Sequence, residues 1–393
     1  MSEAGFSETD LKRLRETMTD FVSAGTVPGL ALALSRGEQV VVEAIGCATP
    51  GGAPLRPDAI FRITSMTRPV TAVAALQLIS TGRLGLDEPV GRLLPELADR
   101  PVLRRLDGPV ADTVPASRPV TVRDLLTFRA GFGMILAAPE DYPILAAEQA
   151  LELRSVGPPA PGPAREPAEW LRRMGTLPLM DQPGTQWRYA TSSQILGVLV
   201  SRAAGQSLES YCAARIFGPL GMADTGFWVP DSELDRLVPP YDLDDGVLVP
   251  ADDGGQWAGP RPFPDGGAGL VSTVADYLTF GRMLLGGGAL RGTRLLAPEW
   301  VAAMTTSQLT AQQRAAAGPI LDGRGWGFGV SVLDGPDAGP HGYGWSGGYG
   351  TSWLNDPAAG LSGVLGTQVF ASAGSADVEA AFWAGVYAAL EPS

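Results

Sequence analysis

The chain has 393 residues, of which 45% are hydrophobic and 18% are charged, and it carries a formal net charge of −13. A chain of this length can bury a large core and is long for a single domain, so we expect two structural lobes. The acidic charge argues against nucleic acid and anionic membranes as partners, because both bind basic patches. No apolar run approaches the roughly 18 residues that span a bilayer, so membrane insertion is not expected.

The first predicted element is an amphipathic helix. Residues 7–10 read Ser-Glu-Thr-Asp, a typical helix start. Apolar residues then recur on one helix face, at Leu11, Leu14, Met18, Phe21 and Val22. We expect this helix to belong to the fold and not to a signal peptide, which predicts a cytoplasmic location.

Two strands are predicted next, at residues 29–35 and 39–44, and they join at Arg36-Gly37 as a hairpin. Strand patterns return only at residues 326–333, 350–355 and 361–370, before a terminal helix at 376–390. A sheet built from both ends of the chain satisfies this order. We therefore expect an α+β fold, in which an antiparallel sheet is flanked by helices.

The lobes follow from this arrangement. Residues 1–75 and 265–393 are expected to form the sheet lobe, and residues 76–264 a mostly helical lobe inserted into it, with an active-site cleft between them. Two long segments, 137–169 and 231–264, are expected to be irregular and to border that cleft.

The segment at residues 65–68 reads Ser-Met-Thr-Arg and lies directly before Pro69 and the apolar run 70–79. Proline lacks the N–H that an interior helical turn needs, so the helix should begin near Met66 and leave Ser65 at the N-cap. There the serine would meet unpaired N–H groups and the positive end of the helix dipole. Ser65 and Arg68 would share a helix face. This pattern fits a nucleophile, and equally a capping serine beside a solvated arginine.

Further segments carry a family resemblance. They read QPGTQWRYATSS at 182–193, IFGPLG at 216–221, TGFW at 225–228, GGAGLVST at 266–273 and GWSGG at 344–348. With a helix and turn at 122–131, this order resembles the serine β-lactamase and penicillin-binding-protein superfamily, in particular class C β-lactamases and family VIII carboxylesterases. The resemblance covers residues 28–356.

The resemblance implies a covalent mechanism. Ser65 matches the nucleophile that becomes acylated, and Tyr189 matches the tyrosine that exchanges protons with it and with the leaving group. The backbone N–H groups of Ser65 and Gly348 would form the oxyanion hole, whose donors each typically lower the barrier by about 3 kcal/mol.

The resemblance also bears on the substrate. Thr191 stands where many members have asparagine, and Trp345-Ser346-Gly347 stands where β-lactamases have Lys-Thr-Gly. The missing lysine removes a cation that would meet a β-lactam carboxylate. The implied substrate is therefore a small, largely neutral ester, thioester or amide.

Arg68 departs from the family's Ser-x-x-Lys pattern. A guanidinium keeps its proton in proteins, so Arg68 cannot be a general base. As a fixed positive charge it would favour the phenolate of Tyr189, which could then take the Ser65 proton. The alternative is a repurposed fold: a metabolite-binding protein, or a non-hydrolytic catalyst that works through Tyr189 and Arg68. The sequence does not predict the oligomeric state.

Residues 344–348 also match the G-x-S-x-G motif of α/β-hydrolases, whose histidine follows the serine. The single histidine, His341, precedes it, so this match is interpreted as incidental. His341 fits either a base near the pocket or an exposed loop residue.

Tryptophan and cysteine each allow more than one role in this chain. Trp187, Trp228, Trp257 and Trp345 fit either an apolar acyl pocket or the core. Cys47 and Cys212 match no metal spacing and are expected to be free thiols, and neither a metal nor a cofactor is expected.

Overall fold

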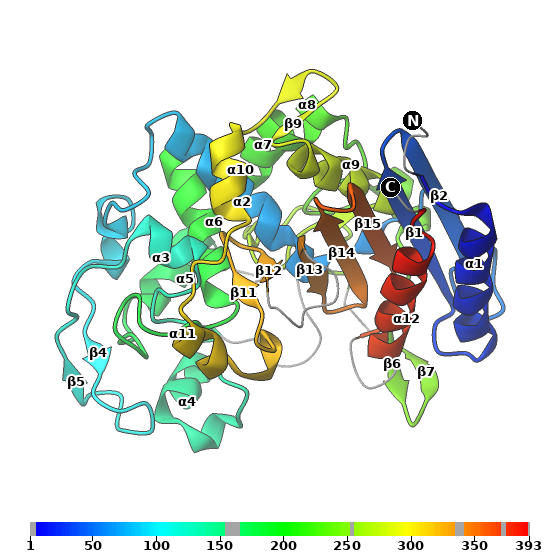
Figure 1. The fold of residues 1–393 in the computed structure, drawn as a ribbon. Helices are drawn as coiled ribbons and strands as arrows, with labels where there is room; N and C mark the ends of the chain where they lie inside the picture. Colours follow the sequence, from blue (N-terminus) through cyan, green and yellow to red (C-terminus); the bar gives the residue numbers. More distant parts are fainter. Residues whose placement is uncertain (1–4, 154–165, 252–254, 335–341, 371–374, 392–393) are drawn as a thin grey trace.

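The computed structural model describes residues 5–153, 166–251, 255–334, 342–370 and 375–391. Among these residues the dominant feature is a seven-stranded antiparallel sheet (Figure 1). In spatial order its strands are β11 (Gly325–Trp326), β12 (Ser331–Leu333), β13 (Gly342–Gly347), β14 (Thr351–Asp356), β15 (Leu361–Gly366), β1 (Gly29–Arg36) and β2 (Gln39–Gly46). The expected α+β fold, with a sheet made from both ends of the chain, is confirmed.

The N-terminal strands join the C-terminal ones through β1. Arg36 pairs with Gln39 across the predicted hairpin, where Gly37 has a φ of 55°. On its other side β1 pairs with β15, with Ala31 opposite Gly366. Strand β1 is therefore a central strand, and all eight of its residues are buried.

The alternation of side chains along β1 separates two cores. Ala31 and Ala33 belong to the large core that the sheet shares with the inner helices. Leu30, Leu32 and Leu34 point the other way, into a second core. The small alanines let a helix approach one face closely, while the leucines fill the space under the outer helices.

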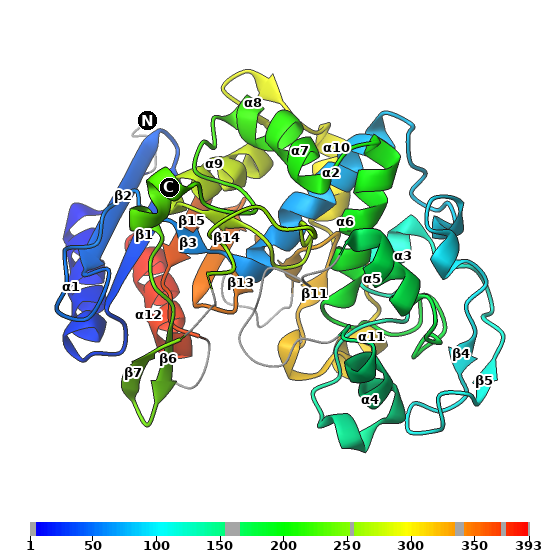
Figure 2. The same ribbon diagram turned by 180° about the vertical axis from the view of Figure 1, so that it is seen from behind.

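Helices cover both faces of the sheet. Helices α1 (Glu8–Ser23) and α12 (Ser375–Ala388) lie side by side on one face (Figures 1 and 2). Helix α9 (Val274–Leu285) packs against β15, β1 and β14 on the other. Ser7 caps α1 as predicted, because its side chain accepts a hydrogen bond from the Asp10 N–H.

The remaining helices form most of the second part of the molecule. They are α2 (Thr67–Ser80), α3 (Val122–Leu126), α4 (Pro143–Ala150), α5 (Pro167–Met174), α6 (Thr191–Ala204), α7 (Leu208–Cys212), α8 (Gly218–Leu220), α10 (Pro298–Met304) and α11 (Ala311–Ala316). Helix α2 packs against α6, and it runs across residue 75, where the sequence placed a boundary between the lobes. The division of the chain into two lobes stays a prediction.

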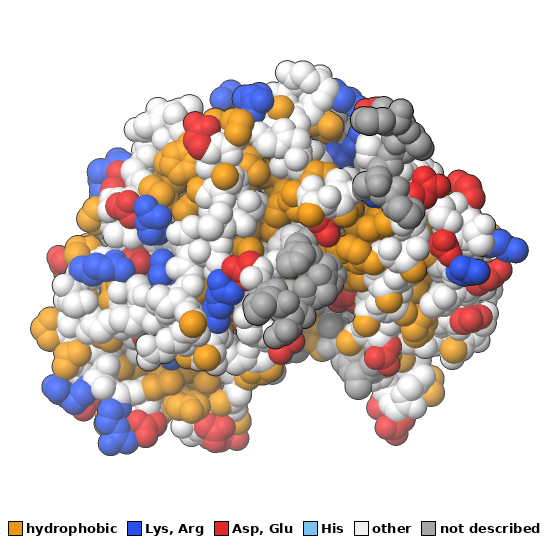
Figure 3. All heavy atoms as spheres, in the orientation of Figure 1, with side chains coloured by type: hydrophobic (Ala, Val, Ile, Leu, Met, Phe, Trp, Pro, Cys, Tyr) orange, Lys and Arg blue, Asp and Glu red, His pale blue; other side chains and the backbone are white. Residues whose placement is uncertain are grey.

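Four short strand pairs complete the structure. They are β3 (Phe61–Arg62) with β8 (Val271–Ser272), β4 (Val102–Leu103) with β5 (Thr113–Val114), β6 (Tyr241–Asp244) with β7 (Val247–Pro250), and β9 (Ala289–Leu290) with β10 (Thr293–Arg294). Figure 3 shows the face of Figure 1 hollowed at its lower edge, between the helical part of the molecule and the β6–β7 hairpin.

Several predicted boundaries were wrong. The strand predicted at 350–355 is β14, and residues 344–347 of the glycine-rich segment belong to a separate strand, β13, which a turn divides from β14. Gly350, with a φ of 75°, allows that turn. The strand predicted at 326–333 is two short strands, and the one predicted at 361–370 ends at Gly366.

The two segments expected to be irregular contain regular elements. Segment 137–169 includes α4 and the start of α5, and segment 231–264 includes the β6–β7 hairpin. Pro143 and Pro167 each occupy the first turn of a helix, where the missing N–H has no cost. The proline-rich stretch 158–163 lies outside the described residues.

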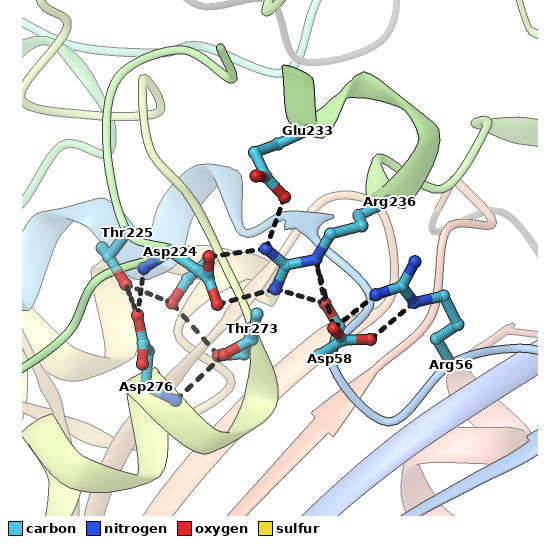
Figure 4. Close-up of polar contacts among 9 residues, drawn as sticks. Arg56, Asp58, Asp224, Thr225, Glu233, Arg236, Thr273 and Asp276 are labelled. Carbon is cyan, nitrogen blue, oxygen red and sulfur yellow. Dashed lines mark hydrogen bonds and ion pairs between the residues drawn. The ribbon is translucent and has the colours of Figure 1, made fainter. Parts of the chain in front are cut away.

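A polar network fixes the start of α9 (Figure 4). The Asp276 carboxylate accepts hydrogen bonds from the Asp224 N–H at 2.8 Å and the Thr225 hydroxyl at 3.0 Å. Arg236 in turn binds both carboxylate oxygens of Asp224 and one of Glu233. Burial raises the pKa of Asp276 to about 6, although these donors and Arg236 partly offset it.

Asp276 predicts a pH-dependent loss of stability. Because its folded pKa lies above its usual value, the native state binds more protons than the unfolded state between about pH 4 and pH 6. The free energy of unfolding of wild type, relative to Asp276→Asn, should therefore fall by about 2–3 kcal/mol as pH rises through that window. Urea unfolding of both proteins at several pH values measures this difference. A difference that does not change with pH would contradict the assignment.

Candidate active site

Ser65 lies in a short 3₁₀ turn, Thr64–Met66, that leads into α2. Helix α2 begins at Thr67, and its N-cap is Met66, so the prediction that Ser65 is the N-cap was wrong. The cause is Thr64, whose φ of 42° starts a tighter turn before the helix. The N–H of Thr67 then bonds within that turn, to the carbonyls of Thr64 and Ser65. Ser65 remains partly exposed at this end of the helix.

Helix α2 is buried on all sides, and a glycine-rich segment packs against it. The Thr71 hydroxyl donates to the Gly266 carbonyl at 2.8 Å, and the Leu270 N–H donates to the Thr67 hydroxyl at 3.0 Å. A side chain at Gly266 would lie 2.7 Å from the Ser193 carbonyl of α6, which is closer than real Cβ atoms come. The glycine therefore allows segment 266–270 to pack tightly against α2 and α6.

Tyr189 lies just before α6, in a strained turn. Ala190 has a φ of 79° and a ψ of −76°, and the Thr191 N–H donates to the Tyr189 carbonyl at 3.3 Å. These values describe a classic γ-turn, which is rare and strained. Arg68 supports it, because its Nη1 donates to the Ala190 carbonyl at 3.1 Å. Thr191 is the first residue of α6 and is partly exposed.

The phenol oxygen of Tyr189 accepts two hydrogen bonds. Arg68 Nε donates to it at 3.0 Å, and Trp345 Nε1 donates at 2.8 Å. A phenol oxygen has two acceptor sites, so both are in use. This arrangement brings together three of the residues that the sequence predicted, from α2, the α6 loop and β13.

Aromatic rings surround Tyr189. Trp187 lies 5.9 Å from its ring, Trp345 5.5 Å and Phe128 6.2 Å, measured between centroids. Trp326, which the sequence did not single out, packs against Trp345 at 4.9 Å. Trp187 and Trp345 are therefore placed at the candidate site.

The two other tryptophans lie elsewhere. Trp257 is fully buried and donates to the Gly269 carbonyl at 3.1 Å. Trp228 donates to a carboxylate oxygen of Glu209 at 2.7 Å. Neither contributes to the aromatic cluster around Tyr189.

Arg68 is buried, with 4% of its surface exposed, and its guanidinium lies 4.3 Å from the Tyr189 ring centroid. A buried carboxylate that the sequence did not single out, Asp265, lies nearby. A side chain at Gly267 would lie 3.0 Å from Arg68 Nη1 and 3.1 Å from Asp265 Oδ1. Burial raises the pKa of Asp265, while the Gly267 N–H, Gln194 and the charge of Arg68 lower it. Asp265 therefore lies near Arg68, and its carboxylate accepts hydrogen bonds from the Gly267 N–H and from Gln194.

Strand β13 contributes the third motif. Trp345 faces Tyr189, and the next residue, Ser346, faces the other side of the sheet, as strand alternation requires. The Ser346 hydroxyl donates to Glu379 of α12 at 2.6 Å, and Ser352 donates to the same oxygen at 2.6 Å. Among the described residues Glu379 forms no ion pair. The side chain of Ser346 thus contacts a carboxylate and does not contact Tyr189.

The turn after β13 lies against the turn that holds Ser65. A side chain at Gly347 would collide with the carbonyl of Ile63, so glycine is needed there. The Gly348 N–H, which was predicted to donate to the oxyanion, donates to the Thr64 hydroxyl at 2.8 Å. Along the chain, Ser65 therefore directly follows Thr64, which contacts Gly348, and precedes by three positions Arg68, which contacts Tyr189.

His341 lies outside the described residues. Cys47 and Cys212 are free thiols, as expected. In the part of the chain that the structure describes, no group of three or more His, Cys, Asp or Glu residues could hold a metal ion. No helix in that part is long and apolar enough to cross a membrane.

The sheet built from both termini, the buried helix that follows Ser65 and the contact of Tyr189 with Arg68 on that helix define a protein with the serine β-lactamase fold. A model of the Beta-lactamase family matches residues 14–388, and the chain belongs to that family. The resemblance stated from the sequence is confirmed.

Known proteins of this kind are similar to the chain. Protein Rv1367c of Mycobacterium tuberculosis is 38% identical over 291 residues, which cover 72% of this chain and 69% of that protein. Esterase EstB of Burkholderia gladioli is 34% identical over 335 residues, which cover 79% of this chain and 77% of that protein. The solved structure of EstCE1, a hydrolase with promiscuous acyltransferase activity, gives a TM-score of 0.82 at 25% identity and covers 97% of this chain and all of that one.

Proposed function

We propose that the protein is a serine acyl hydrolase or acyltransferase that forms an acyl-enzyme on Ser65. The observation that carries the proposal is the Tyr189 phenol oxygen, held by Trp345 and by Arg68, which lies three residues after Ser65 in the chain. Similarity to an esterase and to a hydrolase with acyltransferase activity supports the same reaction class. A small-molecule substrate is the proposed partner, and a cytoplasmic location stays a prediction.

In the proposed mechanism Tyr189 is the general base. Two hydrogen-bond donors, one of them charged, hold its oxygen in place, and as the phenolate it takes the proton from the Ser65 hydroxyl. The serine oxygen attacks the substrate carbonyl carbon, and the leaving alkoxide takes the proton back from Tyr189. Water or another alcohol then attacks the acyl-enzyme by the same steps in reverse. Arg68 keeps its proton throughout and acts only as a fixed charge and donor.

The charges around the site favour a substrate without a carboxylate. Trp345 and Thr191 replace residues that hold β-lactams in the family. The aromatic rings next to Tyr189 suit a small apolar group.

Ester and β-lactam turnover test the proposal. We expect hydrolysis of a short-chain aryl ester, with kcat/KM for penicillins and cephalosporins at least about 100-fold lower on the same preparation, because Trp345 stands in place of the cation that would meet their carboxylate. Efficient β-lactam turnover by wild type would contradict the proposed substrate class.

The second candidate is a protein that binds a metabolite, or a non-hydrolytic catalyst that uses Tyr189 and Arg68. The observation that favours it is the Gly348 N–H, which is already bonded to Thr64 and would otherwise be an oxyanion donor. A chain that never acylates at Ser65 but still binds or converts a small molecule would fit this candidate.

A further inference from the structure

Thr64, directly before the proposed nucleophile, has an unusual backbone. Its φ is 42°, a conformation that is an outlier for a β-branched residue, and it is fully buried. Strain of this kind persists only where the surroundings hold it, and it concentrates at functional sites. The contact that holds Thr64 is the hydrogen bond from the Gly348 N–H to its hydroxyl, at 2.8 Å.

This hydrogen bond uses the donor that the proposed reaction needs. An oxyanion hole requires N–H groups directed at the carbonyl oxygen as it gains negative charge. A charged acceptor forms a hydrogen bond roughly twice as strong as a neutral one. The Gly348 N–H is therefore expected to remain on the neutral Thr64 hydroxyl in the free enzyme and to pass to the substrate oxygen only as charge develops there.

The two turns remain together without this bond. The Thr351 hydroxyl donates to the Ile63 carbonyl at 3.4 Å, and Gly347 packs directly on the same backbone. Removing the Thr64 hydroxyl would thus free the Gly348 N–H without separating the two turns.

We infer that Thr64 is a positioning residue that competes with the oxyanion for the Gly348 N–H and so slows acylation of Ser65. The inference rests on the proposed function. The Thr64 hydroxyl affects the energy of the transition state and not substrate binding, because the substrate's carbonyl oxygen carries negative charge only in the transition state. Loss of the hydroxyl should raise kcat and leave KM nearly unchanged.

The test compares four variants on a short-chain aryl ester. Thr64→Ala and Thr64→Gly are expected to raise kcat about fivefold, the factor that one neutral hydrogen bond typically contributes. Their KM values should stay within about twofold. Thr64→Ser keeps the hydroxyl, and Thr351→Ala removes the other contact between the turns, so neither should accelerate the reaction. Glycine adopts a φ of 42° without strain, so Thr64→Gly is informative even if the alanine variant folds poorly.

The failure of the Thr64 inference and the failure of the proposed function give different results. If both hydroxyl-free variants keep their fold by circular dichroism and turn over at or below the wild-type rate, Thr64 does not compete for the donor. If Ser65→Ala is as active as wild type, the proposed function itself fails, whatever the Thr64 variants do.

Discussion

Replacing Ser65 with alanine is expected to lower kcat/KM for a short-chain aryl ester by about 10³-fold or more. The reason is that removal of a nucleophile leaves only the contributions of binding and of the oxyanion donors. Ser346→Ala is the matched control, since Ser346 belongs to the G-x-S-x-G match but its side chain contacts Glu379. It should keep most of the activity.

The comparison decides between two serines. Suppose that Ser346→Ala loses about 10³-fold of kcat/KM while Ser65→Ala stays active. The nucleophile would then be Ser346 on β13 and not Ser65. Steady-state rates of both variants, measured with wild type on the same ester, are sufficient to see this.

Tyr189→Phe is expected to lower kcat/KM by about 10²- to 10⁴-fold, the usual contribution of a positioned general base. Arg68→Gln removes the charge and the Nε donor, so it should also reduce the rate strongly. Because Arg68 is proposed to act through the Tyr189 oxygen, the double variant should be no slower than Tyr189→Phe alone.

The coupling between these two residues is the informative quantity. Additive losses in the double variant would mean that Arg68 contacts the substrate independently of Tyr189. If the Arg68→Gln variant has the same kcat/KM as wild type, the buried guanidinium has no part in the reaction. Melting temperatures of all three variants distinguish lost chemistry from lost folding.

Much of the fold could be predicted because it depends on local patterns. The hairpin at Arg36-Gly37, the amphipathic α1 and the return of strands after residue 324 all follow from periodicity and turn residues. The helix start at Thr67 could not, since the 3₁₀ turn before it depends on a contact between Thr64 and Gly348, which are 284 positions apart.

The candidate site was predictable only in part, for the same reason. Ser65, Tyr189 and Trp345 lie in recognisable motifs, and strand alternation on β13 would have predicted that Ser346 and Trp345 point to opposite faces. Asp265 has no such signal. Only the packing of the glycine-rich segment 266–270 against α2 brings this carboxylate close to Arg68.

Intact mass after exposure to a fluorophosphonate tests the central claim most directly, because the reagent phosphonylates an activated serine and cannot be hydrolysed away quickly. Wild type is predicted to gain one phosphonyl group, located on Ser65 by peptide mapping, and Ser65→Ala to gain none. Tyr189→Phe should be labelled far more slowly than wild type. A wild-type protein that stays unmodified while folded, or one that carries the label on another residue, would contradict the proposed Ser65 acyl-enzyme.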